Sequence, residues 1–303
     1  MKILGFGEIL WDIIEGQAHI GGAVFNLTAH IAKMGADASI VSSVGDDDLG
    51  RKALQVSVGY GIATSFISTD PEAPTGTVDV SLDGEGHPEY IIHEGVAWDR
   101  IRLSEANEEM LGSTHWDAFC IGTLAQRGEN NRKTLDRLLP MVEVKEVLYD
   151  LNLRQHFFQK DWIERLLGIS TIVKLNDDEA AVLSNLLFDN DLEHKTFSEK
   201  LAERFQLSVI LLTKGADGAL VFDGRGFHTS YCQDVPIVDT VGAGDSFSAG
   251  FLFAYLSGSS AFEAADFAGR VADVVVSKRG AVPEYPPELV EEIESIAMQK
   301  KNG

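Results

Sequence analysis

The chain of 303 residues has few cysteines and few basic residues. Its two cysteines, Cys120 and Cys232, are too few and too far apart to predict a disulfide framework or a metal cluster. Lys and Arg number 25 against 47 Asp and Glu, and the formal net charge is −22 with no basic run. We therefore expect no nucleic-acid partner and no binding to an anionic membrane. An anionic ligand would have to be held by a few groups at its site, such as backbone N–H groups, and not by a positively charged surface.

Long hydrophobic runs are also missing, and none approaches the length of a transmembrane helix. The N-terminal stretch 1–8 is interrupted too soon by Gly and Glu for a signal peptide, so we expect a cytoplasmic protein. With 45% hydrophobic and 24% charged residues, the composition is that of a globular protein with a core, in which Cys120 would be buried. No repeat, linker or low-complexity segment is present, which predicts a single domain over residues 1–303.

Predicted strands and helices alternate along most of the chain. Strands are expected at 2–6, 38–44, 118–122, 144–149, 169–175 and 209–213, and helices at 23–34, 130–142, 178–187, 198–205, 245–257, 261–277 and 287–299. This alternation predicts an α/β fold with a mostly parallel sheet and right-handed crossovers. Ligands of such folds bind at the carboxyl ends of the strands.

Residues 75–93 break this rhythm and predict a β-hairpin. Residues 77–82 alternate in polarity, 83–86 (Asp-Gly-Glu-Gly) predict a turn, and 89–92 predict the return strand. An exposed hairpin needs a partner surface for stability, and a second copy of the chain could supply one. His93 follows the hairpin and is interpreted as a surface or ligand contact.

The most informative stretch is residues 239–247, Asp-Thr-Val-Gly-Ala-Gly-Asp-Ser-Phe. A short apolar strand formed by Val235, Ile237 and Val238 is expected before it. Gly242, Ala243 and Gly244 form a turn with almost no side chain, and a helix is expected from about Asp245. The free N–H groups and positive dipole end of such a helix suit a phosphate. Asp245 would repel that phosphate, which suggests a second role as general base toward an attacking hydroxyl.

A second glycine pair, Gly21-Gly22, precedes the helix 23–34, and Asn26 lies in its first turn. This arrangement suits hydrogen bonds to sugar hydroxyls, although Asn26 could instead cap the helix. Asp12 interrupts an apolar stretch and is either a strand-end surface residue or a ligand for a polar substrate.

Three further groups follow predicted strands. Asn176 and Glu179 have the spacing of a capping box, or could position a metal. Arg154 could contact a sugar or a phosphoryl group, or form a surface ion pair. Thr213, Gly215 and Gly218 predict a turn directly after a strand.

The D-T-x-G-A-G-D string at 239–245 resembles the C-terminal signature of the ribokinase-like (PfkB) family of sugar and nucleoside kinases. A chance match to its six fixed positions is on the order of one in 100,000 in a chain of this length. The G-G-x-x-x-N helix start at 21–26 and the G-x-D-x-x-G segment at 45–50 resemble the family as well, so that the likeness extends over nearly the whole chain. The resemblance implies a three-layer α/β/α fold with a small β lid at about 12–22 and 75–98, through which subunits could pair as a homodimer.

The resemblance also implies roles for individual residues. Catalysis would involve Asp245 as base and the turn Gly242, Ala243 and Gly244. The sugar would be bound by Asp12, Gly22, Asn26 and Arg154. ATP would be bound by Asn176, Glu179, Thr213, Gly215, Gly218 and Gly244, with Mg²⁺ held through water by Glu179 and possible K⁺ at Asp239 and Val241.

Fructose is the first expectation for the substrate. Asp150, Asn152, Arg154 and 97–99 (Ala-Trp-Asp) resemble fructokinases, although Val24-Phe25 and Leu151 depart from the common pattern. Residues 75–98 contain no Lys or Arg, which favours a neutral substrate. The alternatives are ribose, 2-keto-3-deoxygluconate or adenosine as substrate, or a non-catalytic sensor. A Rossmann dehydrogenase is disfavoured because 5–10 lacks the third glycine of its fingerprint.

Overall fold

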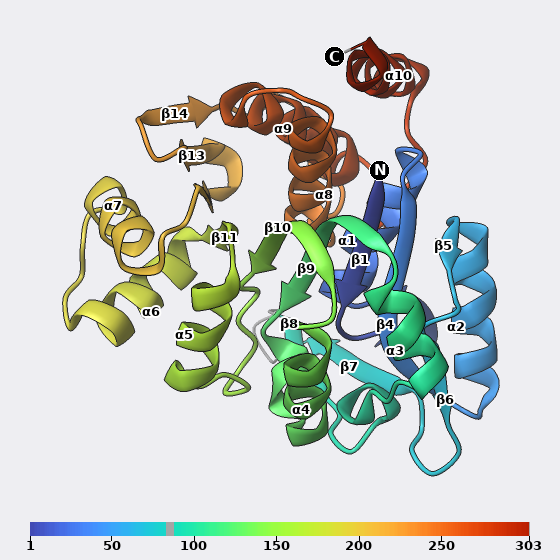
Figure 1. Ribbon diagram of the computed structural model, residues 1–303. Helices are drawn as coiled ribbons and strands as arrows, with labels where there is room; N and C mark the ends of the chain where they lie inside the picture. Colours follow the sequence, from blue (N-terminus) through green and yellow to red (C-terminus); the bar gives the residue numbers. More distant parts are fainter. Residues whose placement is uncertain (83–87, 303) are drawn as a thin grey trace.

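The computed structural model describes residues 1–82 and 88–302, and it has two sheets (Figure 1). The larger is ten-stranded, in the order β14-β13-β12-β11-β10-β9-β1-β4-β5, with β6 also paired to β4. All its strand pairs are parallel except β12–β13 and β13–β14. Its strands are β1 (Lys2–Phe6), β4 (Asp37–Gly45), β5 (Ile62–Ala63), β6 (Ile67–Asp70), β9 (His115–Gly122), β10 (Glu143–Asp150), β11 (Ile172–Asn176), β12 (Val209–Thr213), β13 (Ala219–Phe222) and β14 (Phe227–Ser230). The predicted mostly parallel α/β sheet is confirmed.

Helices cover both faces of this sheet, because successive strand side chains point to opposite sides. Ile3 and Ile172 contribute to one core, whereas their neighbours Leu4 and Val173 contribute to the other. The first core packs against α1 (Ala23–Lys33), α8 (Ala243–Leu256), α9 (Ala261–Val276) and α10 (Pro287–Asn302). The second packs against α3 (Glu105–Gly112), α4 (Glu129–Leu138), α5 (Lys160–Ile169), α6 (Asp177–Phe188) and α7 (His194–Phe205). The result is the three-layer architecture that the sequence led us to expect.

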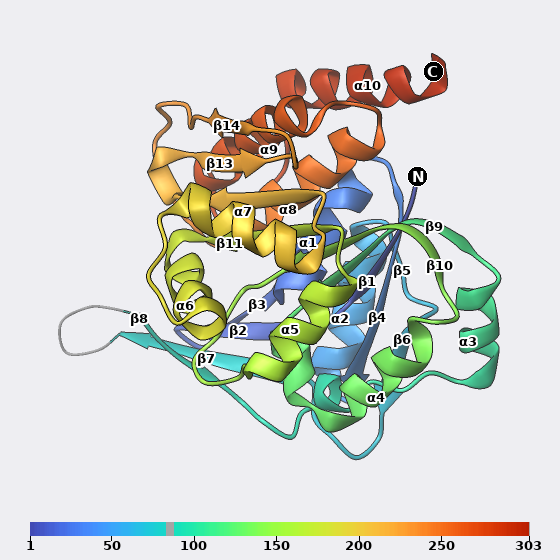
Figure 2. The ribbon, with the colours of Figure 1, turned by 60° about the vertical axis from the view of Figure 1, so that its left-hand side comes forward.

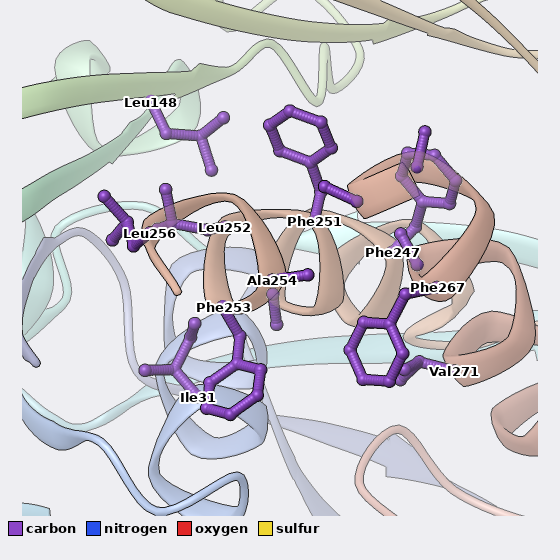
Figure 3. Packing of buried hydrophobic residues seen from close by; sticks show 14 of the residues in the cluster. Ile31, Leu148, Phe247, Phe251, Leu252, Phe253, Ala254, Leu256, Phe267 and Val271 are labelled. Carbon is purple, nitrogen blue, oxygen red and sulfur yellow. The ribbon is translucent and has the colours of Figure 1, made fainter. Parts of the chain in front are cut away.

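Helix α8 is enclosed by its neighbours in the first layer. Figure 3 shows Leu148 of the sheet on one side of it, Ile31 of α1 on another, and Phe267 with Val271 of α9 on a third. Its residues 246–254 are all buried. Burial of each large apolar side chain contributes about 1.5–3 kcal/mol, so packing holds α8 firmly against the sheet and its neighbouring helices. Although α8 is apolar on every side, neither it nor any other described helix is long and apolar enough to cross a membrane.

The smaller sheet has four strands in the order β3-β2-β7-β8. Its strands are β2 (Leu10–Ile14), β3 (Gln17–Gly21), β7 (Gly76–Leu82) and β8 (Pro88–Ile92). β2 joins the two halves, antiparallel to β3 and parallel to β7, and β7 pairs antiparallel with β8. Figure 2 shows β7 and β8 extending away from the central sheet. The predicted turn at 83–86 lies outside the described residues. α2 (Asp48–Gly59) packs near α1, in a cluster with Phe25 and Ile62.

Two local predictions are wrong. Val235, Ile237 and Val238 form no strand, and Ile237 and Val238 are 66% and 54% exposed. This segment is attached instead to the end of α9, where the N–H groups of Val238 and Asp239 donate to the carbonyl of Val276. Likewise, the strand expected from Ile169 begins only at Ile172, because Ile169 is the last residue of α5.

Candidate active site

The carboxyl ends of the parallel strands meet at one edge of the central sheet. Glu8 follows β1, Asp150 ends β10, and Asn176 ends β11, in register with Thr213 at the end of β12. Because β10, β11 and β12 are adjacent and parallel, their polar ends form one row. The starts of α1 and α8 meet near this row, and the candidate site is built around their contact.

The turn before α8 has the geometry of an anion cradle. Gly242 has φ 79°, and a Cβ there would lie 2.5 Å from the carbonyl oxygen of Ala281. α8 begins at Ala243, two residues before the predicted start at Asp245. The N–H of Ala243 donates weakly, at 3.3 Å, to Thr240. Within the described chain, the N–H groups of Gly242, Gly244 and Asp245 have no protein partner, so these three are the donors open to an anion.

Asn26 connects the two helices. Its Nδ2 donates to Oδ2 of Asp245 at 2.8 Å, although the two residues are 219 positions apart. The alternative that Asn26 caps α1 is wrong, since the N-cap of α1 is Gly22 and the amide of Asn26 donates to Asp245 instead. The Oδ1 atom of Asn26 is buried without a partner in the described part of the chain. Such an acceptor is available to a hydroxyl of a ligand.

The environment of Asp245 favours its protonated form more than water does. Burial and the nearby Asp150 carboxylate raise the pKa of Asp245 to about 7, against the hydrogen bond from Asn26 and the charges of Lys174 and Arg154. A carboxylate with a pKa near neutrality is suited to accept and release a proton.

Asp12, Gly22 and Arg154 are close to the same space. Burial raises the pKa of Asp12 on β2 to about 6, while the charge of Arg154 lowers it. The side chain of Arg154 is exposed and has no ion pair within the described residues, yet its charge also acts on Glu8 and Asp245. Arg154 is therefore a cation free to contact a ligand rather than one fixed by a surface partner.

Glu8 belongs to this site although the sequence did not single it out. Its Oε1 accepts the N–H of Ala23 at 2.8 Å, and its main-chain oxygen would be 2.4 Å from a Cβ at Gly22, whose φ is 113°. Its Oε2 is buried without a partner among the described residues, and burial raises its pKa. A carboxyl directly after a buried strand, next to Gly7, is the sequence signal that could have indicated it.

Asn176 and Glu179 form the capping box that their spacing predicts. Asn176 Oδ1 accepts the N–H of Glu179, and Glu179 Oε2 accepts the N–H of Asn176. The other carboxylate oxygen of Glu179, Oε1, accepts the N–H of Leu153 at 2.8 Å. Each carboxylate oxygen retains a lone pair for one more donor, so Glu179 fits a metal-bound water better than direct coordination. Burial raises the pKa of Glu179, and the charge of Lys174 lowers it.

Lys174 and Asp150 form a buried ion pair that the sequence analysis did not predict. Their Nζ and Oδ1 atoms are 3.1 Å apart, and Ser248 donates to the other oxygen of Asp150 at 2.8 Å. The available signal was a single lysine within the apolar strand β11, two residues before Asn176.

The remaining candidates lie at the margins of the site. Lys214 N–H donates to Gly218 at 2.7 Å, which closes the predicted turn of Thr213, Gly215 and Gly218 after β12. Asp239 accepts N–H groups from Val241 and Gly280, at 3.0 and 2.9 Å, and so joins the anion turn to the loop after α9. Of these residues, Thr213 is tied to the row of strand ends, because it pairs with Asn176 across β11 and β12. His93 is a surface residue paired with Asp79 on β7.

Comparison with known proteins agrees with this geometry. The model of the pfkB family carbohydrate kinases matches residues 4–287. A fructokinase of Salmonella typhimurium is 28% identical, with 83% of each chain covered, and an aminoimidazole riboside kinase of Salmonella typhimurium strain LT2 is 27% identical, with 94% of this chain and 92% of the relative covered. The fold matches that of the fructokinase from Vibrio cholerae O395, solved with fructose, ADP and calcium, with a TM-score of 0.81 and 21% identity over 96% of this chain and 98% of that chain. The chain therefore belongs to the PfkB family of carbohydrate kinases.

Proposed function

We propose that this carbohydrate kinase transfers the γ-phosphoryl group of ATP to a primary hydroxyl of a neutral sugar, with fructose as the first candidate. The hydrogen bond between Asn26 and Asp245 is the main support, because it joins a hydroxyl-binding helix start to a base beside an anion cradle. A non-catalytic sensor would need no carboxylate at this point, where it opposes anion binding.

In the proposed reaction, Asp12, the Gly22 turn, Asn26 and Arg154 hold the sugar hydroxyls. Asp245 accepts the proton of the attacking hydroxyl as its oxygen bonds to the γ-phosphorus. The turn Gly242, Ala243 and Gly244 contacts the phosphoryl group, and the N–H groups of this turn and of Asp245 offset the charge that develops on it. The pKa of Asp245, about 7, leaves a substantial fraction of the base ionised at neutral pH.

On the nucleotide side, Thr213, Gly215 and Gly218 lie at the end of β12 and would contact the ribose and phosphates. Asn176 orients Glu179 through the capping box, and Glu179 would accept a hydrogen bond from a metal-bound water. Mg²⁺ would neutralise phosphate charge when bound. Asp239 and Val241 are the proposed place for a monovalent cation such as K⁺. The hydrogen bond that the Gly280 N–H donates to Asp239 brings two loops together there.

The choice of substrate is supported by charge and by relatives. Residues 75–98, which include β7 and β8, carry no Lys or Arg to hold a phosphorylated sugar. Several relatives are fructokinases, at 26–28% identity. The aminoimidazole riboside kinase at 27% identity favours a nucleoside-like acceptor as the second candidate. Ribose, 2-keto-3-deoxygluconate and adenosine are further candidate acceptors.

The small sheet is proposed to act as a lid over the sugar and as a dimer contact. It presents the exposed apolar side chains of Ile14, Tyr90 and Ile91. Closure would exclude water, which competes with the sugar as phosphoryl acceptor. A cytoplasmic location agrees with the proposed substrates.

The test is ADP release from Mg-ATP with neutral sugars, sugar acids and nucleosides as acceptors. Turnover with fructose above all others is the expected result. Preference for another acceptor would keep the mechanism and reject fructose. Tight ATP binding without turnover of any acceptor would contradict the proposal and favour the sensor.

A further inference from the structure

Lys174 is a buried cation that none of the roles above uses. Its side chain is 8% exposed, and Asp150 Oδ1 is its one hydrogen-bond partner within the described residues. An ammonium group has three N–H donors, so two remain. Buried donors without acceptors are costly, which suggests that a ligand completes the set.

The ammonium lies against the first turn of α8. A Cβ built at Gly244 would be 2.8 Å from Nζ of Lys174. Because Cα–Cβ bonds tilt toward the N-terminus of a helix, the ammonium lies beside the end where N–H groups are free. The helix end and the lysine are thus two independent positive features at one place.

The surrounding charges keep this lysine protonated. Burial alone would lower the pKa of Lys174, but the carboxylates of Asp150, Glu179 and Asp245 together raise it above its ordinary value. The group therefore carries its charge at neutral pH.

We propose that Lys174 is a further catalytic residue, whose ammonium donates to a non-bridging oxygen of the phosphoryl group in transfer. This inference rests on the proposed function. The sugar oxygen forms a bond to the γ-phosphorus, the bond from that phosphorus to ADP breaks with its electron pair leaving on ADP, and Asp245 takes the proton. Lys174 keeps its protons, and its charge offsets the negative charge on the phosphoryl oxygens.

The competing interpretation is that Lys174 only neutralises Asp150. The variant Lys174→Met cannot separate the two, since it leaves a buried carboxylate unpaired and could fail to fold. The double variant Lys174→Met with Asp150→Asn removes both charges and keeps an oxygen that can accept from Ser248. It is compared with Asp150→Asn alone, in which the amide oxygen can still accept from Lys174 and the charges of Glu179 and Asp245 still act on the ammonium group. Lys145→Met, on the exposed start of β10, is the matched control.

We expect the double variant to have a melting temperature near that of the Asp150→Asn protein. Its KM for the acceptor should stay within a few-fold of the KM of that protein. Its kcat should be lower than that of Asp150→Asn by about 100- to 1,000-fold, the usual cost of a lost donor to transition-state charge. Equal kcat in these two variants would overturn the proposal.

A binding measurement tests Lys174 without any acceptor. Calorimetry would compare Mg-ADP with Mg-ADP plus aluminium fluoride, which resembles the phosphoryl group in transfer. The Asp150→Asn protein should bind Mg-ADP more tightly with aluminium fluoride than without it. The double variant should not show this increase in affinity. If both variants bind Mg-ADP with aluminium fluoride equally well, the catalytic role of Lys174 is rejected, even if the enzyme phosphorylates a sugar. If the two variants differ as expected but no acceptor is turned over, only the proposed function is rejected.

Discussion

Helices α1 and α8 begin alike but meet different surroundings. Both N-caps are glycines with positive φ, 113° at Gly22 and 79° at Gly242, so neither N-cap residue has a side chain that could cap its helix. In α1 the first N–H donates to the Glu8 carboxyl group. In α8 the N–H groups of Gly244 and Asp245 are open within the described chain, and Lys174 lies beside them.

The difference separates two kinds of ligand. Carboxyl groups of Glu8 and Asp12 beside α1 oppose an anion, whereas the ammonium group of Lys174 beside the start of α8 attracts one. This difference agrees with the proposed sites, a neutral sugar at α1 and a phosphate at α8.

The largest effect is expected from Asp245→Asn. Turnover should fall by about 100- to 10,000-fold, because a general base is lost, while the affinity for ATP measured by calorimetry is kept. The control is Asp48→Asn, whose side chain is 99% exposed. An Asp245→Asn protein with most of its activity would refute the role of base.

The two capping glycines should respond differently to substitution by alanine. Gly242→Ala forces a Cβ to 2.5 Å from Ala281 and strains the anion turn, at a cost of about 1–3 kcal/mol that should reduce kcat. Gly22→Ala strains the α1 start against Glu8 and should mainly raise the KM of the sugar. Steady-state kinetics with each substrate varied measures both. The same kinetic change in both variants would contradict the separation of the two sites.

The pH profile reports Asp245. Because the base must be deprotonated, kcat/KM should fall about tenfold per pH unit below about 7 and level off above it. Burial and Asp150 hold the pKa up, and Asn26 lowers it, so Asn26→Ala should move this limb to higher pH. A limb that stays in place in Asn26→Ala would show that another group governs the profile.

The smallest effect is expected at Glu8. Glu8→Ala removes the acceptor for the Ala23 N–H and should lower the free energy of unfolding by about 1 kcal/mol, as for other lost helix caps. Glu8→Gln keeps an acceptor oxygen and serves as the matched control. Thermal melts compare them, and equal losses in both variants would indicate that charge rather than capping matters.

Much of the site could be predicted from local sequence. The turn at Gly242–Gly244, the position of Asn26 in the first turn of its helix, and the capping box of Asn176 and Glu179 depend on neighbours within a few residues. The segment 235–238 was mistaken for a strand because its apolar residues look like one, although they remain exposed beside α9.

Glu8, Asp150 and Lys174 gave weak local signals. A lone charge at the end of a buried strand predicts nothing about its partner, and Lys174 meets Asp150 only because β10 and β11 pair in register. Only the assembled sheet and the packing of α8 bring these groups to one place.

The sequence by itself determined the alternation of strands and helices and the two glycine-initiated helices, since these follow from short-range periodicity and backbone freedom. The tertiary structure alone decided that Asn26 meets Asp245 across 219 residues, that the Glu8 carboxyl group meets the start of α1, and that a lysine lies under the anion turn. The physical reason is that charge and hydrogen bonding act through space, between residues that only packing makes neighbours.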